Sequence, residues 1–218
     1  MTERRPGRRE ERNAETRSAI LRAAEQLFSA QGWQGTRITE VAARAGVATA
    51  TCYNHFGSKH ALIGHLFAPR IADAVARVED RIAAGAAAHE IIRVAVDETV
   101  RLLKVRRTLT FALFAALQED AIRSDGPPRG PGDVRMIAQI PMILETALQH
   151  ASDVLGLDLD TGRTARYHTN ALLLQVLMRP DSTAGDIADF VLLQLRGAFV
   201  PPYEGTSEEA QVLRVEAP

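Results

Sequence analysis

Apolar residues recur at the spacing of an α-helix along most of the chain, beginning with a stripe formed by Ile20, Leu21, Ala24, Leu27 and Phe28. Asn13 is a suitable N-cap for this first predicted helix, and Gly32 and Gly35 are expected to end it. A short helix is predicted at about 38–45, and another begins just after Gly46. Sustained alternation with a period of two, the pattern typical of strands, is missing from the sequence, so the pattern predicts an all-α protein.

The second part of the chain continues the helical pattern. Ser58 is a predicted N-cap for a fourth helix, and Pro69 inside that helix must bend or divide it. Further apolar-periodic stretches lie at about 88–105, 108–122, 133–155, 163–178 and 184–199, which gives about nine helices in total. Pro141 falls inside the predicted 133–155 helix, where it would remove a backbone hydrogen bond and open the helix.

Residues 47–62, VATATCYNHFGSKHAL, are unusually polar for a helical segment. Val47, Cys52 and Phe56 have the spacing of an inward face, whereas the hydrogen-bonding side chains point outward or sideways. Side chains of this length can donate, accept or contact a thymine methyl group in the major groove of DNA. Together with the preceding short helix and the turn at Gly46, the segment predicts a helix-turn-helix.

Residues 14–67 resemble the DNA-binding domain of the tetracycline-repressor-like (TetR) transcriptional regulators. The resemblance rests on ILRAAEQLFSAQGWQGT, ITEVAARAGVA and YNHFGSKHAL, which occur in this order. It implies a divergent, all-helical C-terminal domain that binds a small molecule and dimerises. The expected organisation is therefore a disordered basic arm at 1–12, a TetR-type helix-turn-helix domain at 13–67, a ligand-binding and dimerisation domain at 68–200, and a flexible tail at 201–218.

The sequence departs from the family pattern at three positions. Cys52 stands where a larger aliphatic residue is common, and we interpret it as a small core residue rather than a redox switch. Arg37 replaces a frequent capping Thr or Ser; Thr36 could cap one residue earlier and so free Arg37 to reach a phosphate. Ala48 replaces a frequent Ser and lacks its capping or phosphate contact.

The charge distribution agrees with DNA binding by the N-terminal part. Residues 1–60 contain 10 Lys and Arg against 6 Asp and Glu, whereas the rest of the chain contains 16 against 21. Lys59 lies in the first turn of the fourth helix, where the helix dipole favours a phosphate, and the resemblance implies a phosphate role for His55. The predicted DNA-contacting residues are Arg37, Thr39, Thr49, Ala50, Thr51, Tyr53, Asn54, His55 and Lys59.

The arginines of the N-terminal arm leave three possibilities open. Arg4, Arg5, Arg8, Arg9 and Arg12 could enter the adjacent minor groove, release counterions without specific contact, or make no contact.

The C-terminal domain carries candidate ligand and dimer residues. The predicted ligand-binding residues are Phe111, Phe114, Met136, Ile140, Ile143, Asn170 and Leu174, and the alternative for at least half of them is ordinary core packing. The stretches at 163–178 and 184–199 are the most continuously apolar, which predicts a four-helix bundle across a homodimer. The predicted interface residues are Leu173, Leu177, Phe190, Val191 and Gln194.

The favoured interpretation is a ligand-responsive regulator, a repressor that binds palindromic operator DNA as a homodimer and is released by a small, largely hydrophobic effector. One alternative is a constitutive DNA-binding regulator without an effector. Another is a helical enzyme or carrier with a vestigial helix-turn-helix, but the sequence contains no nucleophile–base pair, phosphate loop or H-E-x-x-H motif to support it.

Cofactors, metals and membrane spans are not expected. A single cysteine, Cys52, excludes an intramolecular disulfide framework and a cysteine-clustered zinc site. The longest apolar run, 171–178, is too short to span a bilayer and contains Gln175. With no secretory signal visible, the expected location is the cytoplasm.

Overall fold

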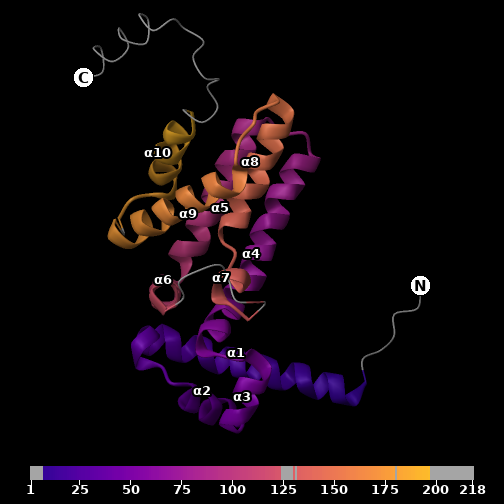
Figure 1. The fold of residues 1–218 in the computed structure, drawn as a ribbon, viewed down its shortest axis with the longest axis vertical. Coiled ribbons are helices and arrows are strands. Elements are labelled where there is room, and N and C mark those ends of the chain that lie inside the picture. Colours follow the sequence, from indigo (N-terminus) through magenta and orange to yellow (C-terminus); the bar gives the residue numbers. More distant parts are fainter. Residues whose placement is uncertain (1–6, 124–129, 131, 180, 197–218) are drawn as a thin grey trace, which may run out of the picture.

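The computed structural model describes residues 7–123, 130, 132–179 and 181–196, and every regular element within these ranges is an α-helix (Figure 1). The helices are α1 (Arg8–Gly35), α2 (Ile38–Ala45), α3 (Thr49–Phe56), α4 (Lys59–Ala83), α5 (Ala88–Val105), α6 (Arg107–Arg123), α7 (Val134–Ile137), α8 (Pro141–Leu155), α9 (Thr161–Met178) and α10 (Ala184–Arg196). The prediction of an all-α protein is confirmed. The tail predicted at 201–218 lies outside the described residues.

The first helix begins six residues earlier than predicted. Gly7 is extended and precedes α1, and its backbone N–H donates to the Glu10 carboxylate at 2.8 Å. This contact satisfies a donor at the helix start, and residues 8–12 are helical. The prediction that Asn13 caps the helix is therefore wrong, as is the prediction of disorder for residues 8–12. At the other end of α1, Gly32 has a φ of 69°, which interrupts the helical backbone.

The turn between α1 and α2 also differs from prediction. The Thr36 hydroxyl donates to the Gly32 carbonyl at 2.8 Å, so Thr36 closes the end of α1 rather than capping α2. Arg37 is the N-cap of α2, and its backbone N–H donates to the Glu40 carboxylate at 3.3 Å. Gly46 then adopts the left-handed conformation, with a φ of 70°, that allows the chain to turn into α3.

A long helix joins the helix-turn-helix unit to the rest of the protein. Ser58 caps α4 as predicted, accepting from the Ala61 N–H at 2.9 Å. The helix continues through Pro69 to Ala83, so Pro69 does not divide it. In Figure 1, α1, α2 and α3 form one end of the molecule, and α4 leads from them into a body built from α5 to α10.

The helix predicted at 133–155 is two helices, which is why the described residues contain ten helices rather than about nine. Ala138 leaves the helical conformation, and Pro141 occupies the first position of α8. A proline is well suited to this position because the first N–H of a helix has no partner. The prediction that Pro141 opens the interior of a long helix is therefore wrong.

The short helix α7 packs against α4 at a glycine. A Cβ atom on Gly64 would lie 3.1 Å from the Ile137 Cβ, so the glycine permits a close approach of the two helices. None of the described helices is long and apolar enough to cross a membrane.

Candidate DNA-binding site

The surface of α3 combines an inward apolar face with an outward polar one, as predicted. Cys52 and Phe56 are buried. Ala50, Tyr53 and Asn54 are exposed, with 49% of the Tyr53 surface accessible. The remaining predicted base- and phosphate-contacting residues of α3, namely Thr49, Thr51 and His55, are half-buried. The structure thus brings all six polar or small residues together on one short helix.

Contacts from α1 and α4 fix the C-terminal end of α3. The Arg17 guanidinium lies 4.5 Å from the centre of the Phe56 ring, and its Nη1 donates to the His55 carbonyl at 3.4 Å. The His65 ring meets the same phenyl group edge-on, at 5.4 Å between centres. Burial, followed by the charge of Arg17, lowers the pKa of His65 and favours its neutral form. These contacts give α3 a rigid support.

Cys52 belongs to this support and not to the exposed surface. It is 2% exposed, and burial raises the pKa of its thiol. A thiol that stays protonated in an apolar setting is unreactive, which agrees with the interpretation of Cys52 as a core residue.

Arg37 and Thr39 lie beside this helix at the beginning of α2, and both are exposed. Because Arg37 caps α2 through its backbone, its guanidinium is not needed for the cap. The position fits the expected phosphate contact.

Lys59 is placed differently from the prediction. Its ammonium group donates to the Trp33 carbonyl at 2.5 Å and lies 4.0 Å from the centre of the Trp33 ring. Burial lowers the pKa of Lys59, and the charge of Glu119 acts in the opposite direction. The side chain thus closes the junction between α1 and α4, and this geometry argues against a phosphate contact by Lys59.

The two roles of Lys59 predict different results for Lys59→Ala. We expect the free energy of unfolding to fall by about 1–3 kcal/mol, because the substitution removes the carbonyl hydrogen bond and the cation–π interaction. The dependence of DNA affinity on salt should not change. Denaturant unfolding and a salt titration of DNA binding measure the two quantities. Arg37→Ala is the control, and it should shallow the salt dependence by about one phosphate contact without loss of stability. A shallower salt dependence with unchanged stability in Lys59→Ala would restore the phosphate role.

Sequence reasoning missed the side chains that connect the helix-turn-helix unit to the body. The Trp33 Nε1–H donates to the Glu119 carboxylate of α6 at 2.6 Å, and His60 lies 4.0 Å from the same carboxylate. Elsewhere on α1, the Glu25 carboxylate pairs with Arg70 at 2.7 Å and with Arg106 at 2.5 Å. A buried tryptophan usually needs an acceptor for its N–H, but the sequence does not reveal an acceptor 86 residues away.

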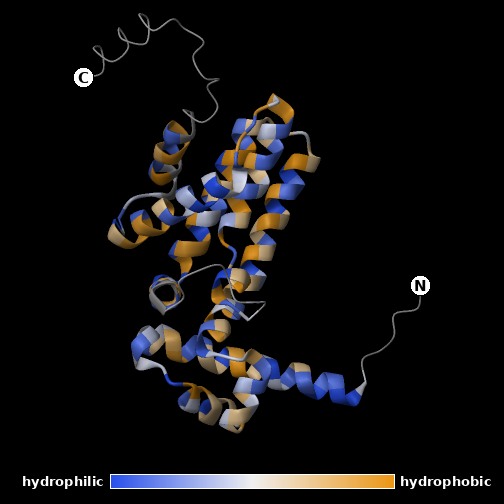
Figure 2. Ribbon diagram, viewed as in Figure 1, coloured by the Kyte–Doolittle hydropathy of each residue, from blue (hydrophilic) through white to orange (hydrophobic). Residues whose placement is uncertain are grey.

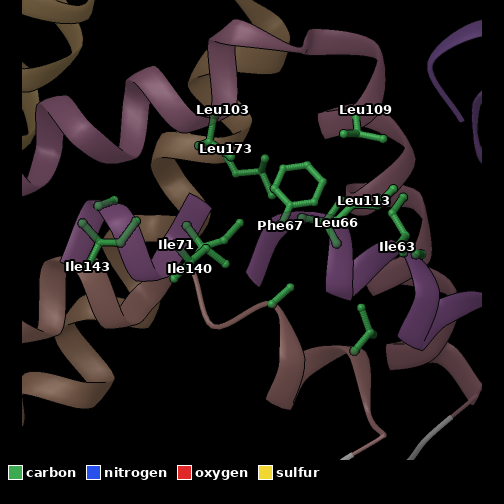
Figure 3. Close-up of a cluster of buried hydrophobic side chains, with 14 of the residues drawn as sticks. Ile63, Leu66, Phe67, Ile71, Leu103, Leu109, Leu113, Ile140, Ile143 and Leu173 are labelled. Carbon is green, nitrogen blue, oxygen red and sulfur yellow. The ribbon is translucent and has the colours of Figure 1, made fainter. Parts of the chain in front are cut away.

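The seven predicted ligand-binding residues differ widely in burial. Ile140 and Ile143 are 3% and 0% exposed, and Figure 3 shows them in the same buried cluster as Phe67. Phe114 is half-buried, whereas the other four are exposed: Phe111, Met136, Asn170 and Leu174. Core packing, the alternative interpretation, therefore describes Ile140 and Ile143.

The body contains two other polar features. An open depression of about 440 Å³ is lined by Glu145, Thr146, Gln149, His150 and Asp153, all on the polar side of α8. In α9, His168 and Thr169 are 7% and 4% exposed, and the His168 Nδ1 and Thr169 Oγ1 atoms have no hydrogen-bond partner among the described residues. Burial lowers the pKa of His168, so its neutral form is favoured.

The predicted dimer residues divide into two groups. Leu173, Leu177 and Val191 are at most 6% exposed within a single chain, so they pack mainly in its own core, and their place in a dimer interface stays a prediction. Phe190 and Gln194 are exposed. Large apolar side chains also remain exposed on the outer faces of α9 and α10, namely Tyr167, Leu174, Met178, Phe190 and Leu193.

Comparison with known proteins agrees with this arrangement. Residues 20–66 match the family described as bacterial regulatory proteins, tetR family. A segment of 46 residues is 50% identical to the HTH-type transcriptional repressor BepR of Brucella suis biovar 1 (strain 1330); it covers 21% of this chain and only 22% of that protein.

Solved structures that resemble nearly the whole fold include two proteins named FadR. FadR of Thermus thermophilus, a TetR-family transcriptional repressor in complex with lauroyl-CoA, has a TM-score of 0.67 and 21% identity over 88% of this chain and 99% of its own. FadR of Bacillus subtilis, in complex with stearoyl-CoA, has a TM-score of 0.57 and 18% identity over 84% of this chain and 99% of its own. At these identities the likeness establishes the fold alone.

Proposed function

We propose that this chain is a transcriptional repressor that binds operator DNA through α3. It is a repressor of the TetR family of bacterial regulatory proteins, the family that residues 20–66 match. The observation that carries the proposal is the exposed polar face of α3 on a rigid support. Ala50 and Asn54 are exposed, while Cys52 and Phe56 anchor the helix. An α-helix presented in this way fits the major groove of DNA. The site of action is then the bacterial cytoplasm, where the chromosome lies.

Selection from a random duplex library tests DNA recognition. We expect the protein to enrich a palindromic sequence, because two copies related by a two-fold axis read two half-sites. Thr49→Ala and Asn54→Ala should then change the preferred bases, at about 1–3 kcal/mol for each good interaction with a base that the substitution removes, as measured by anisotropy with single-base operator variants. Val154→Ala, which is exposed near the end of α8, is a control that should leave base preference unchanged. Failure of the wild type to enrich any sequence would contradict the proposal.

We propose further that a small, largely hydrophobic effector binds in the body and releases DNA. The two FadR structures contain acyl-CoA thioesters, which have long apolar chains. In this chain His168 Nδ1 and Thr169 Oγ1 are buried polar atoms without a hydrogen-bond partner among the described residues. A few polar groups among apolar walls are typical of small-molecule sites.

A constitutive regulator without an effector is the second candidate. The observation that favours it is the tight packing of Ile140 and Ile143, two predicted ligand-binding residues. Addition of lauroyl-CoA, stearoyl-CoA and a library of apolar metabolites to the protein–DNA complex separates the two candidates. Release of DNA by any of these compounds supports the effector, and retention of DNA in all of them supports the constitutive regulator.

The proposed assembly is a homodimer formed through α9 and α10. The exposed apolar residues Leu174, Met178 and Phe190 are distributed over these two helices. Contiguous exposed apolar surface commonly marks a protein–protein interface. The buried residues Leu173, Leu177 and Val191 then support this surface from inside the chain.

A further inference from the structure

The N-terminal end of α1 extends beyond the core of the protein. Every residue from Arg8 to Glu15 is exposed, and the first buried residue of the helix is Ile20. At 1.5 Å per residue, the exposed segment is about 12 Å long. Figures 1 and 2 show this end of the helix projecting past α3, with a hydrophilic surface. Burial of apolar surface therefore does not explain why the segment is helical.

Three arginines form a stripe on this projecting segment. With about 100° between successive residues of a helix, Arg8, Arg9 and Arg12 fall within about 100° of one another. Glu10 lies on the far side of the helix, and Glu11 and Glu15 border one edge of the stripe. Acidic residues are therefore not interspersed among the three arginines.

The arginine stripe continues the buried face of α1. Residues eleven positions apart lie three turns apart and almost in line on a helix. Arg9 and Arg12 are therefore aligned with Ile20 and Ala23, which are 0% and 4% exposed. The face with which α1 packs onto its neighbours thus becomes an exposed cationic face beyond them.

The position of the arginines along the helix is electrostatically unfavourable in the isolated protein. The N-terminal end of a helix carries a partial positive charge, which disfavours a cation placed there. Arg8 and Arg9 are the first two residues of α1. The helix end and the guanidinium groups together make a site that suits an anion.

The projecting segment lies close to the proposed recognition helix. Arg17 contacts the Phe56 ring and the His55 carbonyl, which places it beside the C-terminal end of α3. Arg12 is five residues nearer the N-terminus, about 8 Å farther along the helix axis, and Arg8 is about 14 Å farther. Phosphates line both grooves of a duplex, so a duplex that α3 binds continues with phosphates on either side of the half-site.

We propose that Arg8, Arg9 and Arg12 contact DNA phosphates flanking the half-site that α3 reads. This inference rests on the proposed function, since it requires α3 to bind DNA. The contacts add affinity and fix the position of the protein on the duplex, but they carry no base preference. They extend the DNA-binding surface beyond the helix-turn-helix.

The test uses the full-length protein with all three arginines replaced, Arg8→Ala, Arg9→Ala and Arg12→Ala. Alanine is a strong helix former, so the segment should remain helical, which circular dichroism checks. With a 40-bp duplex of mixed sequence, the slope of log affinity against log salt should become shallower by about 2–3, since each phosphate contact contributes about 0.9. The dissociation constant at 0.1 M salt should rise at least about tenfold.

Two further variants isolate the effect. Replacement of the same three residues by lysine keeps the charges and should retain most of the salt dependence. Replacement of Arg81, Arg163 and Arg179, which are exposed on the body, by alanine removes the same net charge and should leave the slope unchanged. If the first alanine variant keeps the wild-type slope, this proposal is wrong while the proposed function stands. The same conclusion follows if the body variant reduces the slope by an equal amount. Absence of DNA binding by the wild-type protein overturns the proposed function and this inference with it.

Discussion

Replacing Phe190 by aspartate is expected to dissociate the proposed homodimer into monomers and to reduce operator affinity at least about a hundredfold. Phe190 is 45% exposed on α10; Leu193, one turn farther along this helix, is 63% exposed, and Met178, the last residue of α9, is 78% exposed. A carboxylate buried in an apolar interface without a partner costs several kcal/mol. A monomer reads one half-site only, so it loses most of the affinity for a palindrome.

Light scattering at about 10 μM protein and anisotropy with the selected operator measure the two effects. The free energy of unfolding of the monomeric chain should change little, because the side chain is exposed in that chain. Val191→Ala is the matched control. Val191 is 1% exposed, so this substitution should destabilise the fold by about 1–3 kcal/mol and leave the assembly dimeric. A stable Phe190→Asp dimer would contradict the assignment of α9 and α10 to the interface.

The sequence predicted the helix-turn-helix unit well because its signals are local. The apolar spacing of Cys52 and Phe56 fixes which face of α3 is buried, and Gly46 identifies the turn. Ser58 caps the next helix as expected. Each of these features depends on residues within a few positions of one another, and helical periodicity and capping describe such relations well.

The wrongly predicted boundaries depend on competing local contacts. Asn13 is a good cap, but the helix begins earlier, where the Gly7 N–H donates to the Glu10 carboxylate and the Gly7 carbonyl accepts from the Glu10 and Glu11 N–H groups. Pro141 falls in a predicted helix interior because apolar residues continue on both sides of it. In the structure Ala138 ends α7, and the proline begins α8.

Side-chain partners far apart in the sequence could not be predicted. Lys59 has the sequence position of a phosphate ligand, yet the Trp33 carbonyl and ring lie within its reach. Leu173 and Leu177 belong to a stretch with the composition of an interface, yet the packing of one chain already buries them. Periodicity shows that a face is apolar, and it does not show whether the same chain or a second one covers that face.

The second large effect is expected from the contacts that join the helix-turn-helix unit to the body. Glu119 of α6 accepts from the Trp33 N–H of α1, and the adjacent Asp120 pairs with Arg135 of α7 at 3.0 Å. Neighbouring residues of one helix thus contact the helix-turn-helix unit and the body. Arg70, which follows Pro69 in α4, pairs with Glu25 of α1 at 2.7 Å. We hypothesise that residues 66–72 bend when these contacts change.

Glu119→Ala is expected to reduce the coupling between DNA binding by the helix-turn-helix unit and the body. The substitution removes the acceptor of the Trp33 N–H, and Trp33 is only 4% exposed, so the free energy of unfolding should fall by about 1–3 kcal/mol. Coupling between two sites is typically about 1–3 kcal/mol and is reciprocal. Binding of DNA should therefore slow hydrogen exchange in α6 of the wild-type protein, and much less in the variant.

Two variants distinguish coupling from stability. Glu119→Gln keeps an acceptor oxygen, so it should retain the effect of DNA on α6. Pro69→Ala restores a backbone N–H within α4, which stiffens the helix. It should reduce the effect of DNA on the body while leaving the Trp33–Glu119 contact intact. If Glu119→Ala lowers stability but DNA still protects α6 as in the wild type, the contact is structural only. Full protection of the body in Pro69→Ala would instead exclude residues 66–72 as the hinge, because a bend at the proline is what that hypothesis requires.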